Sequence, residues 1–190
     1  HEGIMVLDPA AVPGTLAKDY LNLKTDTLYE IGLTPNRVDA ASFIGVARDL
    51  SAYLRANNMG GELTFPSVEE FDARIAAAAK EGAVKVTVKA KEAAPRYSGL
   101  TIKGVKVGES PEWLKSKLMT IGLRPINSIV DITNYVLMEM GQPMHAFNYN
   151  DLSDKKIIVR TAREGETITT LDGKDYNLNT DMLVIADGEK

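Results

Sequence analysis

The chain has 190 residues, of which 44% are hydrophobic and 25% are charged, and these fractions are those of an ordinary globular protein. It contains no cysteine, which excludes a disulfide framework, thiol catalysis and thiolate metal sites. The formal net charge of -4 gives no bulk electrostatic reason to bind nucleic acid, so any such contact must be local. No apolar run approaches the roughly 18 residues of a membrane span, and no basic-then-apolar signal pattern opens the chain. We therefore expect a cytoplasmic protein with no membrane partner.

The first third of the chain predicts one short strand and one amphipathic helix. The apolar run at residues 4–7 could be a strand. Apolar residues then recur at helical spacing over residues 43–54, and the sequence Asn-Asn-Met-Gly-Gly at residues 57–61 ends that helix. Either Thr34, followed by a proline, or Asp39 is its candidate N-cap.

The middle third predicts a second helix and then strands. A capping box at residues 67–70 opens a helix that ends near residues 80–82. Valines alternate with lysine and threonine over residues 84–89, which is typical of a half-buried strand. Residues 97–107 continue in a β-like pattern with two interrupting glycines. Residues 60–66 could be a linker between domains or merely a loop.

The last third predicts two helices followed by strands. Ser110 and Pro111 cap a helix that is closed by Gly122, and a further helix runs from about Asn127 to residue 140. A tight Asp-Gly turn joins two of the strands that we expect in the tail, which lie at residues 157–159, 167–171, 176–178 and 182–186. Helices and strands therefore come in groups without strict βαβ alternation, and the sequence predicts an α+β fold.

Several common kinds of site are missing from the sequence. There is no glycine-rich phosphate loop, so the chain carries no nucleotide-binding signature. Only two histidines are present, which argues against a histidine-rich metal site, and no metal-binding residue is assigned. A Ser-His-Asp triad would have to use His145, and the nucleophile elbow that accompanies such a triad is absent.

The densest group of polar side chains lies within residues 124–147. Thr133 is the hydroxyl in the apolar stripe of the predicted helix, and Asp131 and Asn134 occupy an adjacent face. His145 follows one turn after the helix ends, on a predicted strand. These groups could position a water molecule or an ester carbonyl. Alternatively, the two helical side chains cap neighbouring backbone and the histidine is a hydrogen-bonded core residue, and spacing alone favours this structural interpretation.

Two other groups have a structural and a functional interpretation. Arg37 and Asp39 are interpreted mainly as helix capping with a buried ion pair, while Tyr97 and Trp113 are expected to pack in the core. One basic stretch is weak evidence for RNA contact, because lysines on a solvated strand face are common; it contains Lys85, Lys89, Lys91, Arg96, Lys103 and Lys106.

Taken together, the sequence resembles the beta subunit of bacterial phenylalanyl-tRNA synthetase, in its central editing region. The resemblance is carried by TPNRVDAASFIGVARDLSAYL, RYSGLTIKGVKVGESPEWLKSKLMTIGLRPINSIVDITNYVLMEMGQPMHAF and VRTAREGETITTLDG. These stretches cover most of residues 29–187 in the order of the family. The resemblance implies the α+β editing-domain fold, with mixed and antiparallel sheets packed with several helices. It also implies that residues 1–28 are the tail of a preceding module or a linker, and that residues 29–190 are an editing domain truncated at its C-terminal end.

The resemblance further implies a site that hydrolyses tyrosine wrongly esterified to tRNA(Phe). By this likeness Thr133 and Asn134 line the substrate pocket with His145, which belongs to the Gln-Pro-x-His stretch, and Pro143 joins the substrate-binding set. Asn134 and His145 are the residues expected to act in catalysis, by positioning the ester and a hydrolytic water. We expect Thr133, Asn134 and His145 to converge on one concave pocket.

The family also implies partners and parts beyond the chain. The expected partners are the 3′ end of tRNA(Phe) with its misattached tyrosine and the alpha subunit of a heterotetramer. ATP and Mg²⁺ serve aminoacylation elsewhere in the parent enzyme, and no cofactor is expected in this segment. The glutamate thought to meet the tyrosine hydroxyl is expected beyond Lys190. The alternative function is a non-catalytic module that guides the tRNA or holds domains together.

Overall fold

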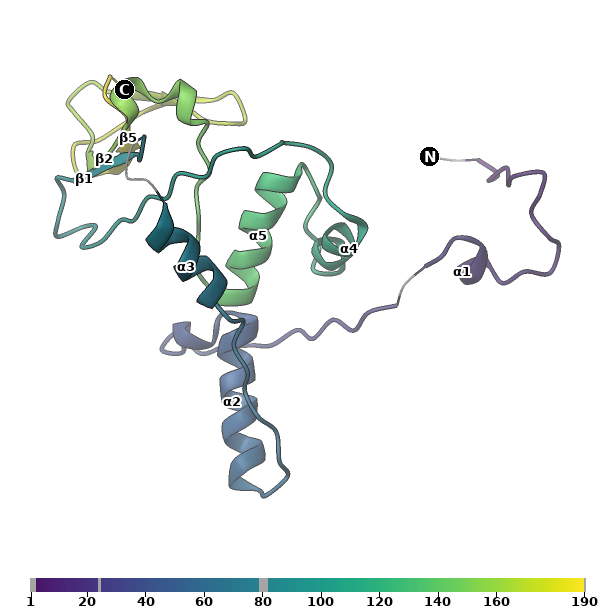
Figure 1. Cartoon of the computed structure of the whole chain (residues 1–190). Helices are drawn as coiled ribbons and strands as arrows, with labels where there is room; N and C mark the ends of the chain where they lie inside the picture. The colour runs from purple at the N-terminus through teal and green to yellow at the C-terminus, as the bar shows by residue number, and fades with distance from the viewer. Residues whose placement is uncertain (1–2, 24, 79–81, 190) are drawn as a thin grey trace. The chain divides into compact units, whose positions relative to one another are not determined.

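The structure is a computed structural model that describes residues 3–23, 25–78 and 82–189 (Figure 1). The chain divides into two compact units, and each unit is assembled from two separate stretches of sequence. The first unit comprises His1–Leu63 with Val107–Met144, and the second comprises Thr64–Lys106 with His145–Lys190. The first boundary therefore falls within residues 60–66, the stretch that the sequence marks as a linker or a loop.

The first unit is helical. Its core is formed on α4 (Glu112–Thr120), where Leu114 and Leu118 are one turn apart and each is 1% exposed. Burying a leucine side chain stabilises the folded state by about 1.5–3 kcal/mol, so this pair is a substantial part of the unit's apolar stabilisation. The α4 helix packs beside α5. The helices of this unit are α1 (Ala17–Tyr20), the 3-10 turn η1 (Val38–Ala40), α2 (Phe43–Ala56), α4 (Glu112–Thr120) and α5 (Ser128–Met140).

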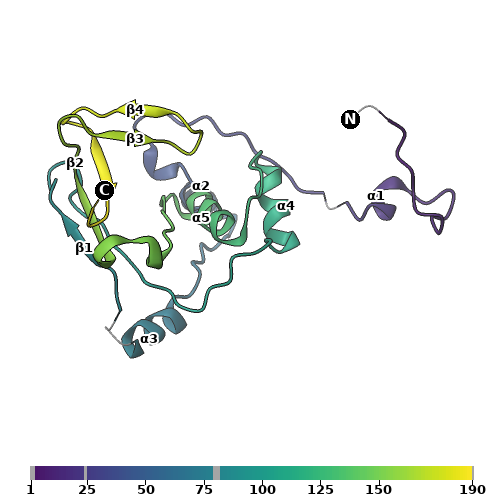
Figure 2. The ribbon, with the colours of Figure 1, turned by 90° about the horizontal axis from the view of Figure 1, so that it is seen from above.

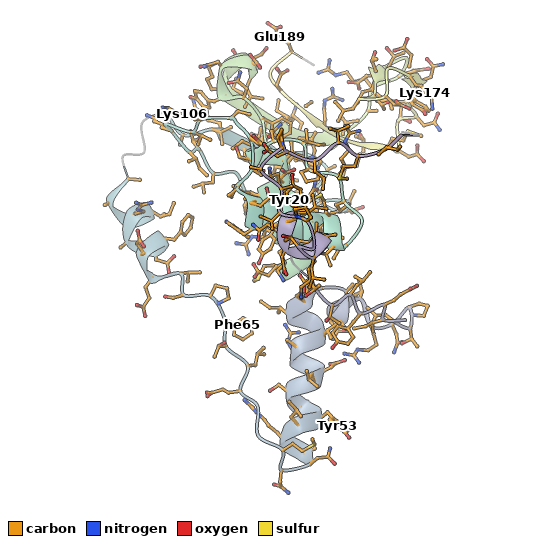
Figure 3. All side chains as sticks on the ribbon, turned by 90° about the vertical axis from the view of Figure 1, so that its right-hand side faces the viewer. Tyr20, Tyr53, Phe65, Lys106, Lys174 and Glu189 are labelled. Carbon is orange, nitrogen blue, oxygen red and sulfur yellow. The ribbon has the colours of Figure 1, made fainter. Side chains whose placement is uncertain are left out.

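The N-terminus of α2 corrects the predicted caps. Ser42 is the N-cap, and its hydroxyl accepts a hydrogen bond from the Gly45 backbone N–H at 3.0 Å. The predicted caps Thr34 and Asp39 lie before this position, because the η1 turn intervenes between them and the helix. Gly45 allows η1 to pack directly on the helix, since a Cβ there would lie 2.5 Å from the Asp39 carbonyl oxygen. Tyr53, near the other end of α2, is exposed (Figure 3).

The second unit contains the strands. In its three-stranded sheet, β2 (Lys156–Thr161) lies between β1 (Lys85–Val88), which is parallel to it, and β5 (Leu183–Ala186), which is antiparallel. A separate antiparallel hairpin pairs β3 (Thr167–Thr169) with β4 (Asp175–Asn177) (Figure 2). The unit also contains α3 and two 3-10 turns, and their bounds are Glu69–Ala77 for α3, Tyr149–Asp151 for η2 and Ser153–Lys155 for η3. The predicted α+β class with a mixed sheet is confirmed.

The central strand β2 supplies the buried side chains of this sheet. Ile157 and Val159 are buried and pair in register with Val86 and Val88 of β1, which are half-buried. Alternation along the strands places these four side chains on one face. The predicted alternating strand is therefore confirmed, at residues 85–88.

Two predicted strands are absent from the structure. Residues 4–7 are irregular and exposed. None of the described strands pairs with them. Residues 97–107 run beside β1 without forming a ladder. There, the Val84 N–H donates to the Thr101 hydroxyl at 2.9 Å, and Gly99 packs against the Val84 and Val86 side chains. Apolar alternation predicted strands, but a strand also needs a backbone partner.

The start of α3 also differs from the prediction. Its N-cap is Val68, whose side chain makes no capping hydrogen bond, and Ser67 accepts only a long 3.4 Å bond from the Glu69 N–H. The capping box predicted at residues 67–70 is therefore wrong, since the helix begins at Glu69 and leaves Glu70 inside the first turn. The helix ends at Ala77, and residues 79–81, where the sequence predicted its end, lie outside the described residues. None of the helices within residues 3–23, 25–78 and 82–189 is long and apolar enough to cross a bilayer.

Candidate functional site

The helix α5 carries two of the predicted site residues, and both of its ends are fixed by local sequence. At its start, the Asn127 side chain accepts hydrogen bonds from the N–H groups of residues 129 and 130, at 3.0 and 3.1 Å. At its end, Gly141 adopts a left-handed conformation with φ of 76°. These are the ends that the sequence predicts for this helix, and they are confirmed.

Thr133 and Asn134 are adjacent on α5, and both are half-buried. The Thr133 hydroxyl donates to the backbone carbonyl of Val130 at 2.7 Å, so its proton is used within the helix and its lone pairs are left to accept. The Asn134 amide has no hydrogen-bond partner among the described residues. A half-buried amide offers two donors and one acceptor to a bound molecule. Of the two, Asn134 is therefore the side chain with more capacity to bind a ligand.

A buried carboxylate holds α5 in place. Asp131 is 0% exposed and accepts hydrogen bonds from the Ser110 hydroxyl at 2.5 Å and from the Ile126 N–H at 2.8 Å. Ser128 reinforces this attachment, because its N–H donates to the Gly108 carbonyl at 2.8 Å. Asp131 thus satisfies neighbouring backbone, as its structural interpretation predicts. Ser110 does not cap α4 as predicted, because its hydroxyl is turned toward this carboxylate.

The segment after α5 contains Pro143 and His145, and both are exposed. His145 stacks on Phe147 with ring centroids 6.1 Å apart and an interplanar angle of 29°. No strand includes residues 143–148, so the strand predicted at the histidine is wrong. The alternative interpretation of His145 as a buried core residue is wrong as well. An exposed imidazole is free to meet a ligand from solvent.

The four predicted residues are divided between the two units. Thr133, Asn134 and Pro143 belong to the first unit, and His145 is the first residue of the later stretch of the second. Convergence of Thr133, Asn134 and His145 on one pocket therefore stays a prediction. Two surface hollows, of about 320 and 500 Å³, are lined by other residues: one by the stretch between Met5 and Leu21, and one by residues 164–165 and 178–180.

A second polar cluster lies at the start of α2. Arg37 donates to both Asp39 oxygens, at 3.0 and 3.1 Å, and to both Asp49 oxygens at 2.7 Å. The guanidinium lowers the pKa of Asp39 through these hydrogen bonds, and the two carboxylates raise the pKa of Arg37. The predicted ion pair is present, but the side chains are between 38% and 50% exposed, so the prediction that it is buried is wrong.

A further ion pair, which was not predicted, lies in the second unit. Arg160 is 7% exposed, and its two terminal nitrogens donate to the two Glu166 oxygens at 2.8 and 2.6 Å. Glu166 also accepts from the Arg163 N–H at 2.7 Å. The Arg160 guanidinium, with this backbone bond, lowers the pKa of Glu166 to about 2. The pair fastens β2 to the turn before β3.

The described residues contain no group of three or more histidine, cysteine, aspartate or glutamate side chains placed to hold a metal ion. Nor does the sequence contain a glycine-rich phosphate loop.

Comparison with known proteins gives the family. The family model of the B3/4 domain matches residues 93–190. The chain belongs to the B3/4 domain family. Thr133, Asn134, Pro143 and His145 all lie within the matched residues, whereas the Arg37 cluster lies outside them.

The chain also matches longer relatives along its whole length. It is 53% identical over 189 residues to "Phenylalanine--tRNA ligase beta subunit" of Bacteroides fragilis, covering 100% of this chain and 23% of that protein. It is 47% identical to the beta subunit of Bacteroides thetaiotaomicron and 43% identical to that of Bacillus cereus, with 100% of this chain covered in both and 23% and 22% of those proteins. The chain thus spans about a quarter of the length of these relatives. The resemblance to bacterial phenylalanyl-tRNA synthetase beta subunits is confirmed.

Within this B3/4 domain, sequence reasoning missed the Ser110–Asp131 hydrogen bond and the Arg160–Glu166 pair. The partners Ser110 and Asp131 are far apart in sequence, and no local pattern links them. Arg160 follows the apolar run at residues 157–159, and that run does not reveal that a turn brings a carboxylate to the arginine. Trp113, expected in the core, is 55% exposed and makes an edge contact with Tyr135, with ring centroids 5.5 Å apart.

Proposed function

We propose that this chain is the post-transfer editing module of a phenylalanyl-tRNA synthetase beta subunit, which hydrolyses tyrosine misattached to tRNA(Phe). The observation that carries the proposal is the match of the whole chain, at up to 53% identity, to phenylalanine–tRNA ligase beta subunits. The exposed His145 and the Asn134 amide, which has no hydrogen-bond partner among the described residues, support it, because ester hydrolysis needs polar groups that are available to substrate and water.

Each of the four residues has a part in the proposed hydrolysis. The Asn134 amide binds the aminoacyl ester, and the Thr133 oxygen accepts a hydrogen bond from the substrate. Pro143 restricts the backbone of the turn that leads to the histidine, because its ring fixes φ. His145 orients the attacking water or takes its proton as a general base. Water attacks the ester carbonyl carbon, the bond to the ribose oxygen breaks, and free tyrosine and tRNA leave.

Discrimination between two similar amino acids gives the reason for a second site. Tyrosine differs from phenylalanine by one hydroxyl, and an apolar pocket rejects an added hydroxyl by only about 10²-fold. A site that offers a hydrogen-bond partner to that hydroxyl discriminates better, because an unpaired buried polar group costs about 1–3 kcal/mol. Editing after transfer therefore raises the fidelity of a synthetase whose first pocket is apolar.

The rest of the enzyme is part of the same proposal. The parent would be a cytoplasmic heterotetramer of alpha and beta subunits that ligates phenylalanine to tRNA(Phe), with ATP and Mg²⁺ bound elsewhere. In this arrangement the present chain contributes no contact with ATP. The competing function is a non-catalytic module that guides the tRNA, and the use of the Thr133 proton within its own helix favours that alternative.

Deacylation of Tyr-tRNA(Phe) by the intact synthetase that carries this chain separates the two functions. We expect His145→Ala to slow hydrolysis by about 10²–10⁴-fold if the imidazole acts as a general base, and less if it only orients water. Met144→Ala, at the exposed neighbouring position, is the matched control and should keep the parent rate. Phenylalanylation of tRNA should be unchanged in both variants. Unchanged hydrolysis in His145→Ala, with weaker tRNA binding, would support the guiding module instead.

A further inference from the structure

The basic segment, defined here as residues 85–106, concentrates positive charge in an acidic chain. Glu92 is its single acidic residue, so the segment has a formal charge of +5 in a chain of -4. All of its cationic side chains are exposed, and they are Lys85, Lys89, Lys91, Arg96, Lys103 and Lys106 (Lys106 is labelled in Figure 3). This segregation distinguishes it from a surface of mixed charge.

None of these six cations forms an ion pair with another described residue. Cations elsewhere in the described chain do form such pairs, including Lys115 with Glu109 at 2.8 Å and Lys174 with Asp172 at 3.0 Å. Exposed cations that are not ion-paired within the described chain are free to bind the phosphates of a nucleic acid, and their binding releases the counterions condensed on it. Such release is the main source of sequence-independent affinity for nucleic acid.

The strand β1 and the residue after it carry two of these cations, Lys85 and Lys89. Lys85 and Thr87 are exposed, on the face opposite the half-buried Val86. Lys85 pairs in register with Lys156 of β2, whose ammonium group is 2.9 Å from an Asp154 oxygen. Asp154 thus balances the charge of Lys156, and the uncompensated positive charge at this position is that of Lys85. Lys89 follows directly after the end of β1 and is exposed as well.

We propose that the basic segment binds the phosphate backbone of RNA without reading its sequence. The choice of RNA over an acidic protein rests on the proposed function, in which the substrate is a tRNA. Lysines predominate, and they act as point charges for phosphate rather than as planar base readers. The one aromatic residue within the segment, Tyr97, is half-buried, and burial raises its pKa, so no exposed ring is available there to stack on bases.

The test is the salt dependence of tRNA binding by the 190-residue chain, measured by fluorescence anisotropy with uncharged tRNA(Phe). Each engaged cation contributes about -0.7 to -0.9 to the slope of log K against log salt, so six give a slope no steeper than about -5. We expect the triple variant Lys85→Gln, Lys89→Gln, Lys91→Gln to flatten the slope by about 2 to 3. The double variant Lys103→Gln, Lys106→Gln should flatten it by about 1 to 2, and serves if the strand variant fails to fold.

The matched control carries Lys115→Gln, Lys117→Gln and Lys174→Gln, which remove three lysines that are ion-paired in the structure. It makes the same change in net charge and should keep the parent slope. Equal flattening in the control and in the triple variant would overturn the proposal, as would an unchanged slope in the triple and double variants. Competition by polyglutamate as effective as that by RNA of equal charge would also overturn it, in favour of an acidic protein partner.

The outcome is independent of the hydrolytic site. His145→Ala should keep the parent salt slope even where it abolishes Tyr-tRNA(Phe) hydrolysis. An unchanged slope in the triple and double lysine variants, with slowed hydrolysis in His145→Ala, would refute the basic segment alone. A flattened slope in those lysine variants, with normal hydrolysis in His145→Ala, would refute the catalytic assignment alone.

Discussion

Ser110 and Asp131 lie 21 residues apart in the sequence, yet the serine hydroxyl donates to the fully buried carboxylate at 2.5 Å. This bond joins the residue before the N-cap of α4 to the first turn of α5. Because α5 carries Thr133 and Asn134, the bond also fixes the helix on which the proposed substrate contacts depend.

We expect Ser110→Ala to lower the free energy of unfolding of the first unit by about 1.5–3 kcal/mol, the usual contribution of a hydrogen bond to a charged group. Asp131→Ala should cost more, because it also leaves the Ile126 N–H without its acceptor. Urea unfolding followed by the fluorescence of Trp113, the single tryptophan, measures both losses. Ser116→Ala on α4 is the control and should change stability by less than about 0.5 kcal/mol. An equally small loss in Ser110→Ala would contradict this account.

Alanine substitutions at two glycines, one after α5 and one after α4, distinguish the cost of backbone strain from the cost of side-chain crowding. Gly141 and Gly122 both have positive φ, at 76° and 80°, so an alanine at either position costs about 1–2 kcal/mol. A Cβ at Gly141 would also lie 3.3 Å from the Ser42 Cβ, whereas nothing lies within 4 Å at Gly122. Gly141→Ala should therefore destabilise the first unit more than Gly122→Ala does, in the same urea experiment. The reverse order would mean that the turn leading to His145 does not pack on Ser42.

Acid should loosen the second unit through Glu166. Its pKa is about 2 in the folded chain, against 4.5 for the ordinary carboxyl, because Arg160 and the Arg163 N–H bind the charged form. A folded pKa below the unfolded value stabilises the fold fully above about pH 4.5, and the stabilisation is lost as the pH falls toward 2.

The carbon-13 shift of the Glu166 carboxyl should titrate with a midpoint near 2, and thermal unfolding by far-UV circular dichroism should lose stability across the same window. Glu166→Gln should weaken this pH dependence. Glu164→Gln, which removes a neighbouring carboxyl without an ion pair in the described structure, should preserve it. A Glu166 midpoint at or above about 4 would show that Arg160 does not hold this carboxylate in solution.

The helix ends and turns that were predicted correctly are those determined by residues close together in the sequence. Asn127 and Gly141 mark the ends of α5 because a cap and a left-handed turn are local requirements. The Asp-Gly turn likewise predicted the β3–β4 hairpin. Residues 4–7 and 97–107 have the alternation of strands, but whether a segment becomes a strand depends on a partner elsewhere in the chain.

The site was predictable to a smaller extent. Its residue identities came from the resemblance to a family, since spacing alone favoured structural roles for Asp131, Asn134 and His145. The structure assigns such a role to Asp131 through Ser110 and Ile126, and it leaves His145 exposed. Neither the pattern of α5 nor the turn after it could reveal the long-range bond that holds the helix.

The most direct test of the central claim is a double-mutant cycle on Tyr-tRNA(Phe) hydrolysis by the intact synthetase, using the parent, Asn134→Ala, His145→Ala and the double variant. If both side chains act on one ester, each single substitution lowers the rate by at least about 10-fold, and the double variant loses less than the product of the two effects. Purely multiplicative losses, or a parent rate retained in either single variant, would contradict a shared hydrolytic site.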